Sequence, residues 1–268
     1  MRLGLIFTRL AACIAAWSCV AAQETKIQVA AASDLKFAMA ELAQKFEDQH
    51  GTKLEVTYGS SGNFFSQIQN GAPFDVFFSA DIEQPRRLAA AGIADSRTLY
   101  EYAIGRIAIW TPADARVDLV RDGWKALLDE RVQKIAIANP EHAPYGKAAV
   151  AAIQKAGIYE QVKAKLVYGE NISQAAQFVQ SGSAQAGILA LSLTASPAMN
   201  DGKCWVIPAE MHAPIEQAAI VLRGARNPNG AAAFLEFVKS GAGREILARF
   251  GFQPPDGAVD AQKKPEEK

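Results

Sequence analysis

Hydrophobic residues follow two alternating patterns from Lys26 onward. Short apolar runs such as 26–33 ("KIQVAAAS") and 74–81 ("FDVFFSAD") are typical of buried strands. Between them lie segments with an apolar residue every three or four positions, which indicate helices; in 34–51 these residues are Leu35, Met39, Leu42 and Phe46. The repeated β-α order predicts an α/β fold with mostly parallel sheets that helices cover on both faces.

The length of the chain, 268 residues, favours two lobes with separate cores. No linker rich in Pro, Gly or Ser divides them, so two long predicted strands, 102–111 and 215–223, are expected to pass between the lobes as a hinge. The predicted segments are a leader over 1–22, the first part of lobe 1 over 23–103, lobe 2 over 104–214, the return of lobe 1 over 215–253, and a disordered tail over 254–268.

The first 22 residues have the composition of a secretory signal peptide. Arg2 and Arg9 accompany an apolar run that is too short for a retained membrane span, and Val20-Ala21-Ala22 supplies small residues before a cleavage point at Gln23. We therefore expect export to the periplasm. Only Cys204 remains after cleavage, which excludes an intramolecular disulfide and a thiolate metal cluster; its side chain is expected to be buried.

Charge excludes one class of partner. The full chain has 28 basic and 28 acidic residues, and loss of the leader removes two arginines and no acid, which leaves a formal net charge of −2. Nucleic-acid binding requires concentrated positive charge, so no nucleic acid is expected.

Small polar residues occupy four predicted strand-to-helix junctions, "AAASDL", "YGSSGN", "NPEHAPYG" and "YGENISQ". Ligands of open α/β sheets bind at the carboxyl ends of strands, where such junctions lie. A helix start offers unpaired N–H groups and the positive end of a dipole, and serine adds a hydroxyl donor. Several starts converging on one cleft would bind an anion without Lys or Arg. Taken singly, each junction is better explained as a helix N-cap.

Motifs for catalysis are weak. "GSSG" lacks the spacing of a G-x-S-x-G elbow, and His50, His142 and His212 have no zinc-site spacing. A secreted enzyme with Ser33 or Ser61 as nucleophile would need a base within hydrogen-bond reach, and the sequence offers no convincing one.

Several blocks of the chain resemble the periplasmic molybdate-binding proteins of bacterial ABC importers. They are "AAASDL", "GSSG..F.QI.NGAP.DVFFSAD", "YAIGRIAIW", "NPEHAPYG" and "FLEFVKS..GREILARFGF", in an order that spans 26–252. The resemblance implies a monomeric two-lobed periplasmic-binding-protein fold of the type II kind, with the oxyanion between the lobes. It implies a binding protein rather than an enzyme, without a cofactor, that delivers molybdate or tungstate to an inner-membrane permease.

The same resemblance implies the binding residues. The oxyanion would be held through Ser33, Ser61 and the amide of Ile172, with further contacts from the amide of Asp34 and from Tyr145 in "APYG". Many family members have a tyrosine donor where this chain has Ala190 in "GILALS", and Tyr145 is the candidate to replace it.

The chemistry of the ligand sets two further expectations. Molybdate is an unprotonated dianion near neutral pH and requires donors, so the carboxylate of Asp34 is expected to cap its helix or face solvent. Sulfate should be excluded by size, and tungstate should bind comparably. A phosphate- or sulfate-binding protein of the same fold remains the alternative.

Overall fold

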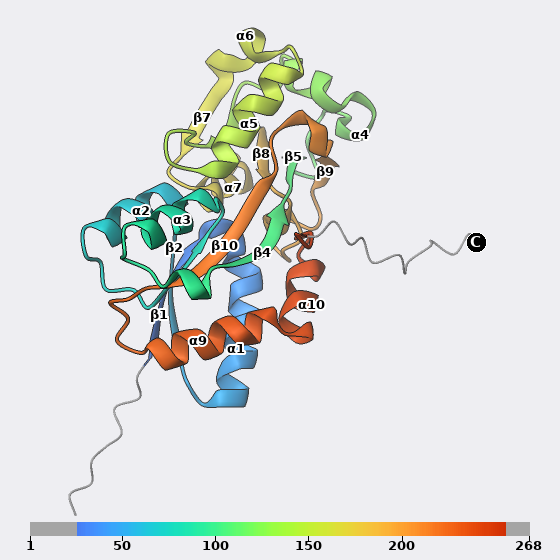
Figure 1. Ribbon diagram of the computed structural model, residues 1–268. Helices are drawn as coiled ribbons and strands as arrows, with labels where there is room; N and C mark the ends of the chain where they lie inside the picture. The colour runs from blue at the N-terminus through green and yellow to red at the C-terminus, as the bar shows by residue number, and fades with distance from the viewer. Residues whose placement is uncertain (1–25, 256–268) are drawn as a thin grey trace, which may run out of the picture.

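The computed structural model describes residues 26–255, which form two α/β lobes (Figure 1). The predicted leader, and the predicted tail from residue 256 onward, lie outside the described residues. Within residues 26–255, no helix combines the length and the apolar character that a membrane span requires.

Lobe 1 is built on a five-stranded sheet in the order β2-β1-β3-β10-β4. Its strands are β1 Ile27–Ala32, β2 Leu54–Gly59, β3 Val76–Ser79, β4 Tyr100–Gly105 and β10 Ile215–Val221. β1 pairs in parallel with β2 and β3, whereas β10 runs antiparallel to β3 and β4. A register shift between Gln217 and Ala218 marks an irregularity in β10 where it pairs with β4.

Lobe 2 is built on a second five-stranded sheet in the order β7-β6-β8-β5-β9. Its strands are β5 Ile107–Thr111, β6 Ile135–Ala138, β7 Leu166–Gly169, β8 Ala186–Ala190 and β9 Lys203–Val206. β6 is parallel to β7 and β8, and β5 is antiparallel to β8 and β9. The predicted two-lobed α/β class is confirmed, although parallel pairing is less dominant in each sheet than the β-α order predicted.

Ten α-helices of the described chain accompany the sheets. Those of lobe 1 are α1 Lys36–His50, α2 Ser61–Gln69, α3 Glu83–Ala90, α9 Pro228–Lys239 and α10 Gly241–Arg249. Those of lobe 2 are α4 Leu119–Asp122, α5 Pro144–Lys155, α6 Tyr159–Val162, α7 Ile172–Gln180 and α8 Leu191–Thr194. Short 3₁₀ turns complete the chain; they are η1 Ser33–Leu35, η2 Ser96–Thr98, η3 Gly123–Leu128, η4 Lys163–Lys165 and η5 Ala209–Met211.

Alternate side chains of β3 in lobe 1 pack into two different hydrophobic clusters, one on each face of the sheet. Val76 and Phe78 of β3 pack in the cluster that contains residues of α1, α9 and α10, whereas Phe77 packs in the cluster with α2 and α3. Successive side chains of a strand point to opposite faces, so one short apolar run serves both helical layers. This is why the run is apolar at every position rather than at alternate ones.

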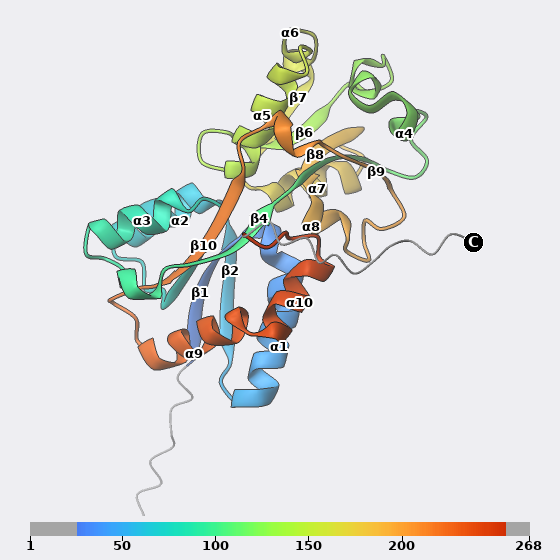
Figure 2. The same cartoon turned by 45° about the vertical axis from the view of Figure 1, so that its right-hand side comes forward.

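Two segments of chain connect the lobes, and both lie side by side at the waist of the molecule (Figures 1 and 2). One joins β4 to β5 through Arg106; the other enters β10 at Ile215. The predicted single strand 102–111 is therefore two strands, one in each sheet. Ile104 and Gly105 belong to the sheet of lobe 1, so the change of lobe lies after Gly105 and not after residue 103 as predicted.

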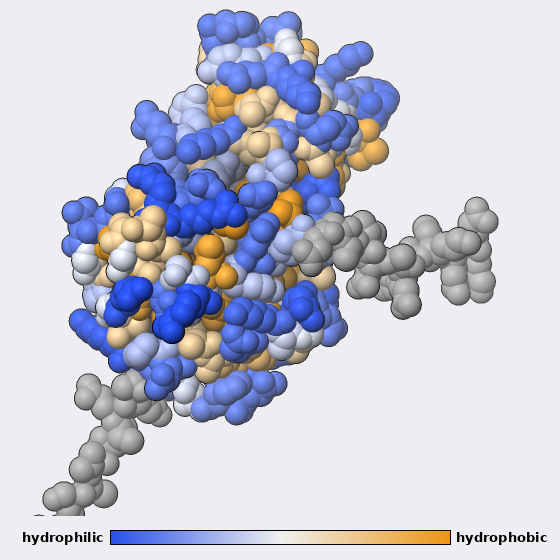
Figure 3. All heavy atoms as spheres, in the orientation of Figure 1, coloured by the Kyte–Doolittle hydropathy of each residue, from blue (hydrophilic) through white to orange (hydrophobic). Residues whose placement is uncertain are grey.

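Hydrophilic residues cover much of both lobes on the face drawn in Figure 3, with hydrophobic residues in patches between them. Cys204 is exposed on β9, which lies at an edge of its sheet. The expectation that Cys204 is buried was wrong, because Cys204 shares the exposed face of β9 with Val206, whereas Lys203 and Trp205 on the other face are partly buried.

Candidate anion-binding site

Four helix starts converge on one small cavity between the lobes. Each start follows the carboxyl end of a strand, β1, β2, β6 or β7, as the four junction motifs predicted. The cavity is lined by Ala32, Ser33, Asp34, Gly59, Ser60, Ser61, Ala80, Ala143, Pro144, Tyr145 and Ile172. None of these residues is basic, so any positive potential here comes from backbone N–H groups and helix dipoles.

The serine pair has two separate roles. Ser60 is the N-cap of α2, and its Oγ accepts from the N–H of Asn63 at 3.4 Å. Ser61 is the first residue of the helix, is buried, and its Oγ accepts from the N–H of Ala80 at 2.9 Å. Because that bond uses a lone pair of Ser61, its hydroxyl hydrogen remains available to a bound anion.

Ser33 lies where the lobes touch. Its Oγ donates to Oδ1 of Asn171 at 3.1 Å and accepts from the N–H of Ser173 at 3.3 Å. The hydroxyl of Ser173 donates to the carbonyl of Ser33 at 2.8 Å. Oδ1 of Asn171 also accepts from the N–H of Gln174 and so caps α7. The same side chain therefore caps a helix of lobe 2 and binds Ser33 of lobe 1. Ile172 follows as the first residue of α7, a position whose N–H has no acceptor within the helix.

Asp34 forms the buried polar centre of the site. Its side chain is 1% exposed, and Oδ2 accepts from the hydroxyl of Tyr145 at 2.9 Å and from Nε2 of Gln217 at 2.8 Å. Its Oδ1 is buried and has no hydrogen-bond partner. The expectation that this carboxylate caps its helix or faces solvent was wrong. Tyr145 from lobe 2 and Gln217 from β10 supply donors that compete with helix capping for the carboxylate.

Burial raises the pKa of Asp34 from 3.8 to about 6. Loss of solvation is the largest cause, and it is only partly offset by the donors of Gln217 and Tyr145 and by the nearby N–H groups of Asp34 and Leu35. The pKa of the Tyr145 hydroxyl lies well above its ordinary value, because it is buried and adjoins the Asp34 carboxylate.

Gln217 is a component of the site that the sequence analysis missed. Its Oε1 accepts from the hydroxyl of Tyr102 at 2.7 Å, which orients Nε2 toward Asp34 and Tyr145. Gly105 gives the network room, since a Cβ there would lie 2.4 Å from the Tyr145 hydroxyl oxygen and 2.6 Å from Nε2 of Gln217. A signal was present in the sequence. Gln217 lies two positions after Ile215 and therefore on the same buried face of the strand, where the other residues are apolar.

A backbone hydrogen bond joins α2 to lobe 2 at Gly62. The N–H of Gly62 donates to the carbonyl of His142 at 2.9 Å. Beside it, Asn63 donates to the carboxylate of Glu170, and Nε2 of His142 lies 3.1 Å from the carbonyl oxygen of Glu170. His142 thus helps to position the loop before α5. The two lobes are therefore in direct contact around the cavity.

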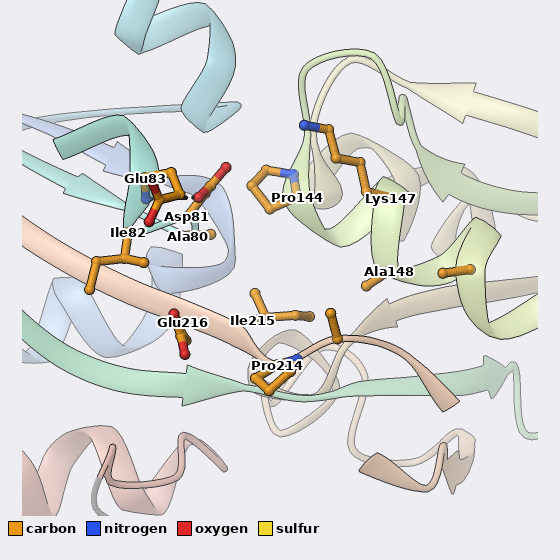
Figure 4. A pocket seen from close by; sticks show the side chains of 12 residues that line it. Ala80, Asp81, Ile82, Glu83, Pro144, Lys147, Ala148, Pro214, Ile215 and Glu216 are labelled. Atoms are coloured by element: carbon orange, nitrogen blue, oxygen red, sulfur yellow. Dashed lines mark hydrogen bonds between the residues drawn. The ribbon is translucent and has the colours of Figure 1, made fainter. Parts of the chain in front are cut away.

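A second pocket at the junction is larger, about 350 Å³, and shares Ala80 and Pro144 with the first. Figure 4 shows its carboxylates, Asp81, Glu83 and Glu216, on one side and Lys147 across from them. Three carboxylates against one ammonium oppose the binding of an anion. The smaller cavity is therefore the better anion site despite its size.

Catalytic and metal chemistry find little support in the described residues. No group of three or more His, Cys, Asp or Glu residues among 26–255 could hold a metal ion. The hydrogen-bond partners of the Ser33 and Ser61 hydroxyls are an amide oxygen and backbone N–H groups, none of which is a general base. Asp75 accepts from the N–H groups of Gln28, Arg226 and Asn227, which is a structural role.

The chain belongs to the bacterial extracellular solute-binding protein family, whose model matches residues 27–253. It is 36% identical over 233 residues to the molybdate-binding protein ModA of Azotobacter vinelandii, covering 87% of this chain and 91% of that one. It is also 36% identical over 212 residues to the protein of the same name from Rhodobacter capsulatus, covering 79% and 82%. The solved structure of the Azotobacter vinelandii periplasmic molybdate-binding protein superposes with a TM-score of 0.80 at 31% identity, covering 86% of this chain and all of that one.

Ser61→Ala is expected to weaken oxyanion binding by about 1.5–3 kcal/mol, the scale of a hydrogen bond to a charged group. The variant also leaves the buried N–H of Ala80 without its acceptor, so the unfolding free energy should fall by about 1–3 kcal/mol. Calorimetric titration and thermal unfolding measure the two effects separately. Ser60→Ala is the control: it removes an N-cap worth about 1 kcal/mol and should change affinity less. Equal affinities of Ser61→Ala and the unmodified protein would remove Ser61 from the site.

Proposed function

We propose that this chain binds molybdate, and comparably tungstate, in the periplasm and delivers it to the membrane permease of an ABC importer. The observation that supports this most strongly is the cavity itself, in which four helix starts and the free hydroxyl hydrogen of Ser61 meet without a basic residue. A tetrahedral dianion requires donors on several sides, and helix N-termini supply them. The names of the relatives that are 36% identical point to the same ligand.

The proposed contacts are hydroxyl and backbone donors to the oxygens of the anion. Ser61 supplies its free hydroxyl hydrogen, and Ile172 supplies the N–H at the start of α7. Ser33 and Asp34 supply N–H groups at the start of η1, which continues into α1. Tyr145 would replace the tyrosine donor that many family members have at the position of Ala190. Its hydroxyl hydrogen points to Asp34, so this donor depends on the state of that carboxyl.

Transport follows from the contacts between the lobes. The anion would bridge helix starts of both lobes, so it binds the closed arrangement better than an open one and shifts the population toward closure. The permease would recognise the closed form. The chain performs no bond chemistry in this role, since neither serine has a base beside it.

The buried carboxylate of Asp34 favours one competing ligand. An acceptor inside an anion site suits a protonated oxyanion such as hydrogen phosphate, which has a hydrogen to donate. Phosphate therefore belongs beside sulfate in any test of specificity.

Thermal unfolding of the mature protein with molybdate, tungstate, sulfate and phosphate in parallel tests the proposal. Ligand at about a thousand times its dissociation constant stabilises by about 4 kcal/mol. For a chain of this size the melting temperature should rise by about 10 °C with molybdate and with tungstate. A rise with phosphate or sulfate alone would keep the class of protein and overturn the ligand.

A further inference from the structure

The carboxyl of Asp34 is the only acidic side chain among the residues that line the anion cavity. It is buried, Oδ2 accepts two hydrogen bonds, and Oδ1 accepts none. In residues 26–255 no lysine, arginine or histidine forms an ion pair with it. An unpaired charge at such a depth is costly, and its usual response is to bind a proton.

The groups that face Asp34 are uncharged at neutral pH. Tyr145 approaches from α5 and Tyr102 lies nearby on β4, and burial holds the pKa of each hydroxyl well above its ordinary value. Gln217 from β10 donates to the carboxylate, and Ser192 from α8 donates to the Asp34 carbonyl at 2.8 Å. Asp34 is therefore the group in this cluster that can change its charge near neutral pH.

The hydrogen-bond directions fix how the cluster holds its protons. Tyr102 donates to Oε1 of Gln217, so Nε2 of Gln217 faces Asp34 Oδ2 and the Tyr145 oxygen, each at 2.8 Å. The Tyr145 oxygen already accepts from Gln217, and its hydrogen goes to Asp34 at 2.9 Å. Oδ2 is thus fully occupied. A further proton would bind at Oδ1, the oxygen without a partner.

A dianion in this cavity would lie beside the Asp34 carboxylate. Two negative groups at close range in a poorly solvated site repel strongly, and one proton between them replaces the repulsion by a hydrogen bond. Protonation at Oδ1 also converts the single acceptor-only side chain of the lining into a donor.

We propose that binding of the dianionic oxyanion is coupled to the uptake of one proton from solvent at the Asp34 carboxyl. This inference rests on the proposed function. The charge balance is that the carboxylate plus one proton becomes the neutral acid, which donates to an anion oxygen. Asp34 thereby becomes a determinant of affinity through its side chain, in addition to its N–H. The count of one proton holds whichever oxygen of the shared hydrogen bond retains it.

Calorimetric titration of molybdate into the mature protein tests the inference in buffers that differ in ionisation enthalpy. The titration is run well above pH 6, where the Asp34 carboxyl of the unliganded protein is ionised. The dependence of the observed heat on the buffer should then give close to one proton taken up per site. The dissociation constant should rise by up to about tenfold per pH unit above that value, until the pKa of the bound state is passed.

Asp34→Asn is the decisive variant, since an amide keeps the shape of the carboxyl and cannot titrate. It should take up no proton, bind molybdate with a dissociation constant independent of pH, and bind at least about tenfold tighter than the unmodified protein two pH units above 6. Asp81→Asn is the matched control, because Asp81 lies in the neighbouring acidic pocket and accepts from the N–H of Glu83. This variant should keep the proton uptake.

The outcomes separate the inference from the proposed function. Molybdate binding by the unmodified protein with no proton uptake and no change with pH overturns the inference alone. Proton uptake that persists in Asp34→Asn does the same. Absence of molybdate binding at every pH overturns the proposed function and the inference together. If Asp34→Asn fails to fold, the proton count of the unmodified protein still decides.

Discussion

Replacement of Gly62 by alanine is expected to weaken molybdate binding by about ten- to a hundredfold while leaving the fold intact. A Cβ at Gly62 would lie 2.6 Å from the carbonyl oxygen of His142 and 3.0 Å from its Cα. Both are backbone atoms that cannot rotate away. Overpacking of this kind costs about 1–3 kcal/mol, and here the strain exists only while the lobes are in contact.

The same substitution should not harm lobe 1 itself. Gly62 lies in α2 with no positive φ, and alanine in a helix is better than glycine by about 0.5–1 kcal/mol. The unliganded protein should therefore unfold at an equal or slightly higher temperature. Loss of affinity without loss of stability indicates that closure is blocked, because the substitution destabilises the closed state and not the open one.

Calorimetric titration gives the affinity, and small-angle scattering with and without molybdate gives the compaction on closure. Ser66→Ala is the control on the same helix, since its side chain is exposed and lies outside the cavity. An unchanged dissociation constant in Gly62→Ala would show that the contact with His142 is not needed for binding.

The second large effect concerns stability rather than affinity. Asp34→Asn should stabilise the unliganded protein relative to the unmodified chain at neutral pH by about 3 kcal/mol, since each pKa unit corresponds to 1.36 kcal/mol. The carboxyl has a pKa of about 6 in the folded protein and 3.8 as its ordinary value. Folding therefore requires the burial of a charge whenever the pH exceeds the folded value.

The sign follows from proton linkage. Between pH 3.8 and about 6 the folded protein binds more protons at Asp34 than the unfolded chain does, so its unfolding free energy falls as the pH rises. Below 3.8 the contribution of this group is fully present, and above about 6 it is lost. Asparagine has no such dependence.

Thermal unfolding of both proteins without ligand, across pH 3.8 to 6 and above, measures the difference. The melting temperatures should diverge by roughly 5–10 °C in favour of Asp34→Asn as the pH rises through this window. Other acidic groups titrate alike in both proteins and cancel. Parallel curves would mean that the Asp34 carboxyl is not desolvated in the folded state.

The architecture around the site could be predicted because its signals are local. Each junction motif contains its own strand end, capping residue and helix start, so Ser33, Ser61, Tyr145 and Ile172 could be placed at helix starts from neighbouring residues alone. Parallel strands then bring the junctions to one edge of a sheet. All five predicted site residues line the same cavity.

The direction of the Asp34 side chain could not be predicted in the same way. Its partners, Tyr145 and Gln217, are 111 and 183 positions away in the chain, and one of them belongs to the other lobe. A local rule favours an acid at a helix start pointing along its own helix or into water. Hydrogen-bond donors that are distant in the sequence overrode that rule, and no pattern within a few residues of Asp34 indicates their presence.

The division of the predicted strand 102–111 has a similar cause. Both halves are apolar and rich in β-branched or aromatic residues, which is what a strand requires in either sheet. The change from one sheet to the other at Arg106 depends on which strands lie alongside. The exposure of Cys204 likewise depends on which face of β9 the rest of lobe 2 covers, a property of the fold rather than of the residues of the strand.

The proposed function is tested most directly by anomalous diffraction from crystals of the mature protein grown with molybdate. We predict one strong molybdenum peak inside the cavity, within hydrogen-bond reach, through the oxygens of the anion, of Ser33, Ser61 and the N–H of Ile172. A crystal without molybdenum at this cavity, or with molybdenum bound only elsewhere on the molecule, would contradict the proposal that these helix starts hold the anion.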